Sequence, residues 1–76
     1  MYIVIEIQYI NDRDITTFIS PPETLAAAES RYYTILAAAA ISNIPIHSAT
    51  ILNEQGAQIA HESYSHEIPA EINETE

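Results

Sequence analysis

The chain has 76 residues, with no cysteine and no lysine, and its eleven acidic residues against two arginines give a net charge of −9. A chain of this length forms a single domain near the lower size limit for independent folding, and without cysteine it has neither disulfides nor thiol-based metal sites or nucleophiles. The negative charge argues against binding to DNA, RNA or an anionic membrane through phosphate neutralisation. It is compatible with simple solubility and with attraction to a basic protein surface, and both interpretations stay open.

The chain begins with an alternating apolar segment. Residues 2–10 read Tyr-Ile-Val-Ile-Glu-Ile-Gln-Tyr-Ile, which has the two-residue period of a β-strand. We expect the odd-numbered side chains from Ile3 to Tyr9 to form the core face, and the opposite face to be mixed. The polar residues 11–14 predict a turn, and residues 15–19 predict a second, shorter strand that closes a hairpin.

Residues 20–43 predict the one long helix of the chain. Ser20 followed by Glu23 matches a capping box, and the two prolines between them would fall in the first helical turn, where proline is tolerated. The body of the segment is rich in alanine and leucine, the strongest helix formers. Asn43 and the Ile-Pro pair after it predict the end of the helix, with Asn43 suited to a left-handed conformation.

The two faces of this predicted helix differ in character. One face is an ordinary core stripe of Leu25, Ala28, Tyr32, Ile35, Leu36 and Ala39. The other face is small or apolar, and consists of Ala27, Ser30, Thr34, Ala37, Ala38 and Ile41. Either alanine is only exposed helix filler here, or the second face is an interface on which another backbone packs closely. We favour the interface, which predicts a homodimer or a larger homo-oligomer.

The second half of the chain predicts another hairpin. Residues 44–52 and 57–64 read as strands, and Gly56 between them suits a turn position with positive φ. The expected order is ββαββ, a small antiparallel sheet with one long helix packed on one face, in the α+β class. Residues 1–66 would form this single domain, and we expect residues 67–76 to form an acidic, flexible C-terminal tail.

No catalytic or metal-binding motif is found in the sequence. The three histidines, His47, His61 and His66, lack the spacing of a zinc site, so we expect neither metal nor cofactor. The serines near them are not part of a nucleophile elbow, and a single glycine leaves no phosphate cradle or oxyanion nest. These observations favour a protein that is not an enzyme.

The best local candidate for a ligand site is Arg31, Tyr32 and Tyr33. One arginine with stacking aromatic rings can hold a nucleotide base and phosphate, particularly where an oligomer interface repeats the set. The alternative places Tyr32 in the core and Tyr33 at the rim, with Arg31 paired to an acid such as Glu23 or Glu29. We favour this alternative.

Four segments together carry a resemblance to other proteins: MYIVIEIQ at residues 1–8, AESRYYTILAAAA at 28–40, IPIHSA at 44–49 and NEQG at 53–56. With them the chain resembles short, uncharacterised acidic proteins encoded by phages and mobile elements of gut Gram-positive bacteria. The resemblance covers most of residues 1–66 and implies no catalytic residues. It implies a context in which small acidic proteins often inhibit host machinery, as anti-CRISPR proteins and nucleotide-signal sponges do.

We therefore expect a non-enzymatic, oligomeric binding protein. The leading hypothesis is inhibition of a host defence protein, in the manner of an anti-CRISPR protein, by an acidic surface that meets a basic one. The residues of this acidic surface are Asp12, Asp14, Glu54, Glu67 and Glu71. The alternatives are a sponge-like binder of a small nucleotide signal at a protomer interface, and a structural or assembly protein.

The expected location is the cytoplasm, which would be the host cytoplasm for a phage-encoded protein. No apolar run reaches the length of a transmembrane segment, and no basic region precedes the first apolar segment as it does in a secretory signal. We expect contact neither with a membrane nor directly with nucleic acid.

Overall fold

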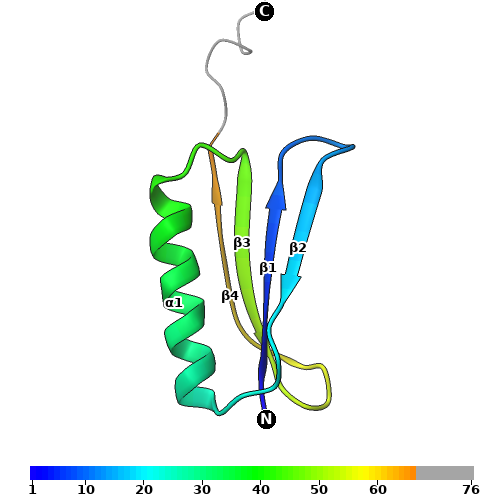
Figure 1. Ribbon diagram of the computed structural model, residues 1–76, viewed down its shortest axis with the longest axis vertical. Helices are drawn as coiled ribbons and strands as arrows, with labels where there is room; N and C mark the ends of the chain where they lie inside the picture. The colour runs from blue at the N-terminus through cyan, green and yellow to red at the C-terminus, as the bar shows by residue number, and fades with distance from the viewer. Residues whose placement is uncertain (67–76) are drawn as a thin grey trace, which may run out of the picture.

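The computed structural model describes residues 1–66, which form a four-stranded antiparallel sheet with one helix against one face (Figure 1). The elements in chain order are β1 (Ile3–Tyr9), β2 (Ile15–Ile19), α1 (Leu25–Ile41), β3 (Ile46–Leu52) and β4 (Gln58–Ser65). The order across the sheet is β2-β1-β3-β4, so the two hairpins meet along β1 and β3. The predicted ββαββ order and α+β class are confirmed. The predicted tail at residues 67–76 lies outside the described residues.

Side-chain and backbone hydrogen bonds close both hairpin turns. In the β1–β2 turn, the Asn11 Oδ1 accepts from the backbone N–H groups of Arg13 and Asp14, at 2.8 Å and 3.0 Å. In the β3–β4 turn, the Gly56 N–H donates to the Asn53 carbonyl at 3.0 Å, and Gly56 has a φ of 82°. Glycine adopts this left-handed conformation without steric cost, so its predicted role in the turn is confirmed.

The helix begins later than predicted, and Ser20 is not its N-cap. The cap is Thr24, whose Oγ1 accepts from the backbone N–H of Ala27 at 3.2 Å. Glu23 is held in extended backbone pairing with Tyr2, with two N–H to carbonyl hydrogen bonds of 2.8 Å. Because this long-range pairing keeps the chain extended, the helix starts only after it. The Ser20 hydroxyl accepts instead from a backbone N–H of β1, at 2.8 Å.

The helix also ends without the left-handed residue that was predicted around Asn43. Its C-cap is Ser42 in extended conformation, with ψ of 163°, and the Ser42 N–H donates to the Ala39 carbonyl at 3.3 Å. Among residues 1–66, positive φ occurs only at glycine. The chain therefore passes directly from the last helical turn into an extended connection to β3.

The core lies under the even-numbered face of β1, and the prediction that its odd-numbered face is core was wrong. Val4 and Ile51 are opposite each other in the β1–β3 register and are each 1% exposed. Ala49 on β3 and Ala28 on α1 are fully buried, so the helix can approach closely where both layers have small side chains. The odd-numbered side chains from Ile3 to Tyr9 are only half-buried and lie on the other face.

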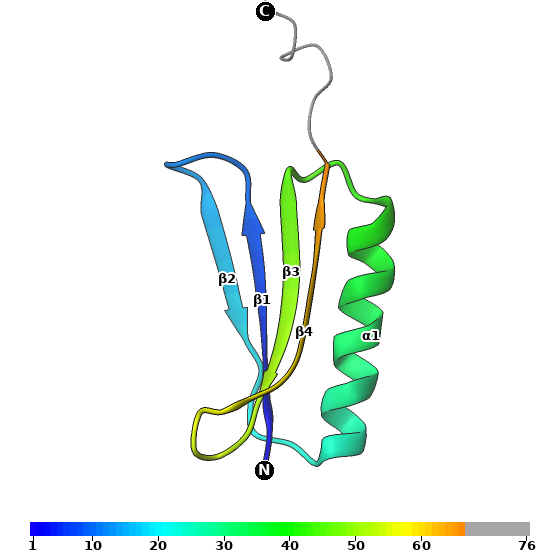
Figure 2. The same ribbon diagram turned by 180° about the vertical axis from the view of Figure 1, so that it is seen from behind.

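The helix is not centred on the sheet. It packs mainly on β3, with β1 and β4 on either side, and leaves β2 uncovered, as both views show (Figures 1 and 2). Its buried residues, Ala28, Tyr32 and Ala39, belong to the predicted core stripe, while Leu25 from that stripe is exposed. The offset leaves room beside the helix, above β1 and β2.

Candidate functional site

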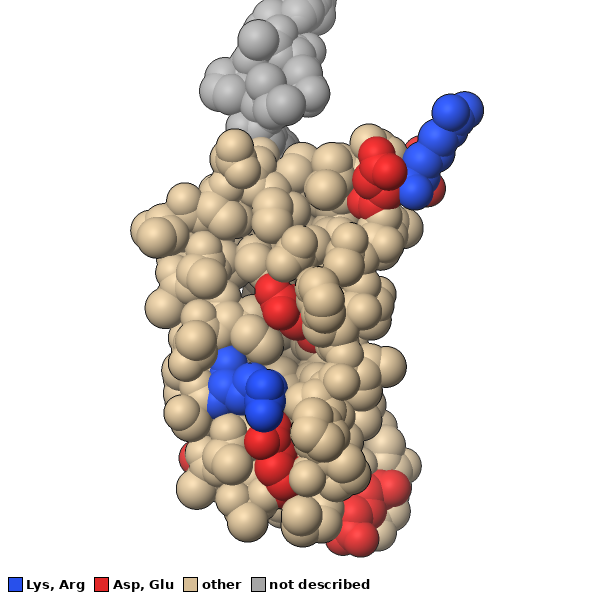
Figure 3. All heavy atoms as spheres, viewed as in Figure 1, with Lys and Arg blue, Asp and Glu red and all other residues tan. Residues whose placement is uncertain are grey.

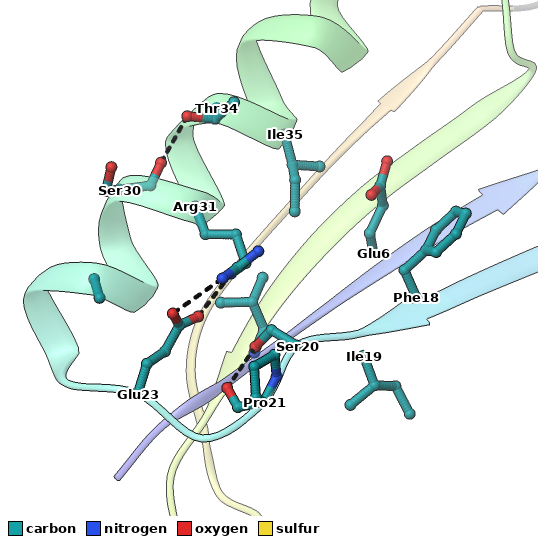
Figure 4. A pocket seen from close by; sticks show the side chains of 12 residues that line it. Glu6, Phe18, Ile19, Ser20, Pro21, Glu23, Ser30, Arg31, Thr34 and Ile35 are labelled. Carbon is teal, nitrogen blue, oxygen red and sulfur yellow. Dashed lines mark hydrogen bonds and ion pairs between the residues drawn. The ribbon is translucent and has the colours of Figure 1, made fainter.

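The space beside the helix is a groove of about 660 Å³ between α1 and the first hairpin (Figure 4). Its helix wall includes Ala27, Ser30 and Thr34, three residues of the small helix face. The facing wall is formed by β2, where Phe18 presents an exposed aromatic ring, and by the loop that follows. Ile35 adds an apolar side chain from the helix. The groove is therefore lined by apolar and polar side chains in similar measure, with Arg31 and two glutamates among the polar ones.

Two carboxylates line this groove, that of Glu23, which is paired with Arg31, and that of Glu6 on β1. Glu6 is opposite Phe18 in the β1–β2 register, and its side chain is 20% exposed. Its Oε2 accepts hydrogen bonds from His47 Nε2 at 2.7 Å and from Gln8 Nε2 at 3.0 Å. A carboxylate can only accept, so His47 carries a proton on Nε2. Both of these contacts from residues 1–66 end on Oε2, which leaves Oε1 available to a ligand.

His47 on β3 donates the shorter of these two hydrogen bonds to the Glu6 carboxylate. It is buried, and its Nδ1 lies 3.4 Å from the Ser42 Oγ, so Ser42, His47 and Glu6 form a serine–histidine–carboxylate chain. Ser42, however, is the C-cap of α1, and its Oγ accepts from the Ile44 N–H at 3.3 Å. Neither Ser42 nor His47 lines the groove. The chain of hydrogen bonds therefore orients Glu6 and does not present a nucleophile to a ligand.

The predicted ligand set of Arg31, Tyr32 and Tyr33 does not line one site, although the two tyrosine rings pack edge to face. Arg31 lines the groove and forms a bidentate ion pair with Glu23, with Nε–Oε2 and Nη2–Oε1 distances of 2.7 Å and 3.2 Å. The hydrogen bonds of this pair lower the pKa of Glu23 and raise the pKa of Arg31. Tyr32 is buried in the core, while Tyr33 is exposed and outside the groove. This is the arrangement that the sequence analysis favoured.

The described residues of the predicted acidic surface lie far apart. Asp12 and Asp14 belong to the β1–β2 turn and Glu54 to the β3–β4 turn, which lie at opposite ends of the sheet (Figures 1 and 2). Figure 3 shows acidic groups spread along the molecule in that view, without one dense patch. Glu67 and Glu71 lie outside the described residues. The negative charge of residues 1–66 is therefore diffuse.

The small helix face that was predicted as an oligomer interface is exposed along its whole length. Its first half lines the groove, and its second half, Ala37, Ala38 and Ile41, continues along the outer side of α1. Ile41 is 88% exposed. The face is thus accessible to a partner, but half of it already belongs to the groove.

The remaining two histidines bond elsewhere. His61 Nδ1 is 2.8 Å from the Thr50 Oγ1, and His66 Nε2 is 2.8 Å from the Ala39 carbonyl. Within residues 1–66, no three His, Cys, Asp or Glu side chains are grouped so that they could hold a metal ion. The helix of this part of the chain is too short and not apolar enough to cross a bilayer.

No known protein family, curated protein or solved structure matches this chain. A functional interpretation therefore depends on the geometry of the chain itself. The groove with Glu6 in it is the feature of the described residues that best fits a binding site.

Proposed function

We propose that the protein is a non-enzymatic binding protein whose groove receives a cationic, partly apolar segment of a partner protein. The observation that carries this proposal is the Glu6 carboxylate, which is fixed in the groove while its Oε1 stays available. A carboxylate held in place by neighbouring hydrogen bonds does not have to be ordered again when a ligand binds, so less entropy is lost.

The charges that line the groove favour a cation. Glu23 and Arg31 pair with each other, so Glu6 is the remaining charged side chain among those that line the groove. A lysine or arginine of the partner would place its charged head at Glu6 and lay its methylene groups on Phe18 and Ile35. The net charge of −9 attracts a basic partner over longer distances and speeds the encounter.

The charges that line the groove disfavour a nucleotide as the ligand. A phosphate near Arg31 would have to compete with Glu23 for the guanidinium and would lie close to the negative charge of Glu6. Arg13, the other cation, belongs to the β1–β2 turn and does not line the groove. A sponge for an anionic signal therefore fits these charges less well than a receptor for a basic segment.

We further propose that the partner is a host defence protein and that binding inhibits it. The support is the resemblance to phage-encoded acidic proteins, together with the negative charge of the chain. In a bacterium that carries such a defence, expression of the wild type should raise phage plating efficiency and expression of Glu6→Gln should not. An equal rise in plating efficiency with both proteins would show that any anti-defence activity does not depend on Glu6 in the groove.

The binding step can be tested with two short peptides, acetyl-Ile-Arg-Ile-amide and acetyl-Ile-Gln-Ile-amide, titrated into isotope-labelled protein. The arginine peptide should shift the amide signals of the groove, with an affinity that weakens as salt is added, because charged contacts are screened. The glutamine peptide, which lacks the cation, should leave these signals nearly unchanged.

The matched variants are Glu6→Gln and Glu62→Gln. Both glutamates are opposite Ala49, on the helix side of the sheet, but Glu62 is on β4 and outside the groove. Glu6→Gln should weaken binding of the arginine peptide by about tenfold or more, the loss expected for one charge-assisted hydrogen bond. Glu62→Gln should bind as the wild type does. Equal binding by Glu6→Gln and wild type would contradict the proposal.

A further inference from the structure

The sheet has a second apolar face, on the side away from α1. This open sheet face consists of the odd-numbered side chains of β1, β2 and β4 and the even-numbered side chains of β3. On its β1–β2 half, Ile5 is opposite Ile19, with Ile3 and Ile7 on either side along β1. Ile15 and Ile19 are 51% and 64% exposed. An antiparallel sheet covered on one side usually has polar residues on the other, so this row of half-buried and exposed isoleucines is typical of a surface that another molecule covers.

In the strands of residues 1–66, the open sheet face also carries no Asp, Glu, Lys or Arg side chain. Within the four strands of residues 1–66, the Asp, Glu, Lys and Arg residues are Glu6 and Glu62. Both are opposite Ala49 and therefore lie on the helix side. In a chain with a net charge of −9, such a neutral surface is unusual.

We propose that the open sheet face binds a second copy of this chain, so that two sheets pack face to face with the helices outside. Two copies with the same large negative charge repel each other, and contact is least costly where neither presents an acidic group. A basic partner would gain no ion pair on this face, whereas a second copy offers an equally neutral and apolar surface. The groove stays open, because it lies mainly on the helix side and Ile19 is the one residue of the open sheet face that also lines it.

The two halves of the face favour a particular symmetry. The β1–β2 half is rich in isoleucine, whereas the β3–β4 half has hydroxyl and imidazole groups, among them Thr50, His61 and Ser63. A twofold axis that runs across the strands places each half on the same half of the partner. Isoleucines then pack on isoleucines, and the polar half forms a rim that stays hydrogen-bonded to itself or to water.

The size of the face sets the expected strength of the dimer. Four strands spaced about 4.8 Å apart, with about seven residues each at about 3.3 Å, cover roughly 450 Å² per copy and about 900 Å² in total. Stable specific interfaces bury about 1,200 Å² or more in total. The dimer should therefore be reversible, with a dissociation constant in the micromolar range and not an obligate assembly.

Sedimentation equilibrium of the full chain, from about 1 µM to about 1 mM, tests this inference. Ile19→Asp puts a charge on the edge strand, and Ile5→Thr removes apolar surface from β1 while keeping a β-branched residue. Ala38→Glu adds the same charge to the outer helix face and is the control. Circular dichroism shows whether each variant remains folded.

The wild type should change from monomer to dimer as its concentration rises. Ile19→Asp and Ile5→Thr should each weaken the dimer at least tenfold, and Ala38→Glu should leave it unchanged. A wild type that stays monomeric at the highest concentration would overturn the proposal and leave the face to a different protein. A dimer that is lost in Ala38→Glu but kept in Ile19→Asp would overturn it in favour of the helix face.

Discussion

Replacing Ile51 with alanine tests whether the small core under the helix holds the fold together. Ile51 is 1% exposed and packs with Val4, Ala28 and Tyr32. The change removes three carbon groups at about 0.8 kcal/mol each, and the cavity left behind brings the loss of unfolding free energy to about 3 to 4 kcal/mol. A chain of 76 residues has a total stability of about 4 to 11 kcal/mol, so the variant loses about a third or more of it.

Urea unfolding followed by circular dichroism at a fixed protein concentration measures this loss. The matched control is Ile41→Ala, which makes the same chemical change at a side chain that is 88% exposed at the end of α1. Its unfolding free energy should stay within about 0.5 kcal/mol of the wild type. A loss below about 1 kcal/mol for Ile51→Ala, or an equal loss for Ile41→Ala, would refute the packing described above.

Two further predictions concern the start of the helix and a buried tyrosine. Thr24→Ala should lower the unfolding free energy by about 1 kcal/mol and speed hydrogen exchange of the Ala27 amide. Ser20→Ala should leave the exchange of that amide unchanged, because Ser20 bonds to β1. Faster exchange of the Ala27 amide in Ser20→Ala but not in Thr24→Ala would make Ser20 the cap. Burial, and to a smaller extent the nearby charge of Glu62, raises the pKa of Tyr32 above its ordinary value of 10.0. The folded state therefore favours the protonated phenol, and the stability that this contributes is complete below pH 10.0 and is lost as pH rises through the raised pKa. Urea midpoints measured across this range should fall less steeply in Tyr32→Phe, and equal slopes would contradict the assignment.

The sequence predicted the elements of the fold because their signals are local. Alternation in residues 3–9 and the polar turn after them specify the first hairpin, and Gly56 specifies the second turn. The helix start was missed because Ser20 and Glu23 satisfy a local capping pattern, while the backbone pairing of Glu23 with Tyr2 is a long-range contact. Local patterns cannot report which distant strand will hold a segment extended.

The face of β1 that becomes core was missed for a related reason. Both faces of β1 carry apolar residues, so alternation alone does not tell which face meets the helix. The choice depends on Ala49 of β3, which is small and lies under the helix beside Glu6. It follows from the pairing of β1 with β3, and not from β1 itself.

The candidate site was predicted only in part. Ala27, Ser30 and Thr34 were predicted as part of an oligomer interface, and the structure places them on one wall of the groove. The Glu6–His47 contact joins residues that are 41 positions apart and depends on the β1–β3 register, so spacing could not reveal it. A single glutamate within an apolar strand was the one local sign that β1 contributes more than packing.

Intermolecular nuclear Overhauser effects between the bound arginine peptide and the wild-type protein test the central claim most directly. The account predicts cross-peaks from the arginine methylene protons to the ring of Phe18 and the methyl groups of Ile35, because both side chains line the groove beside Glu6. Cross-peaks to the turn of Asp12 and Asp14, with none to the groove, would instead place the cation on the diffuse acidic surface and contradict the account.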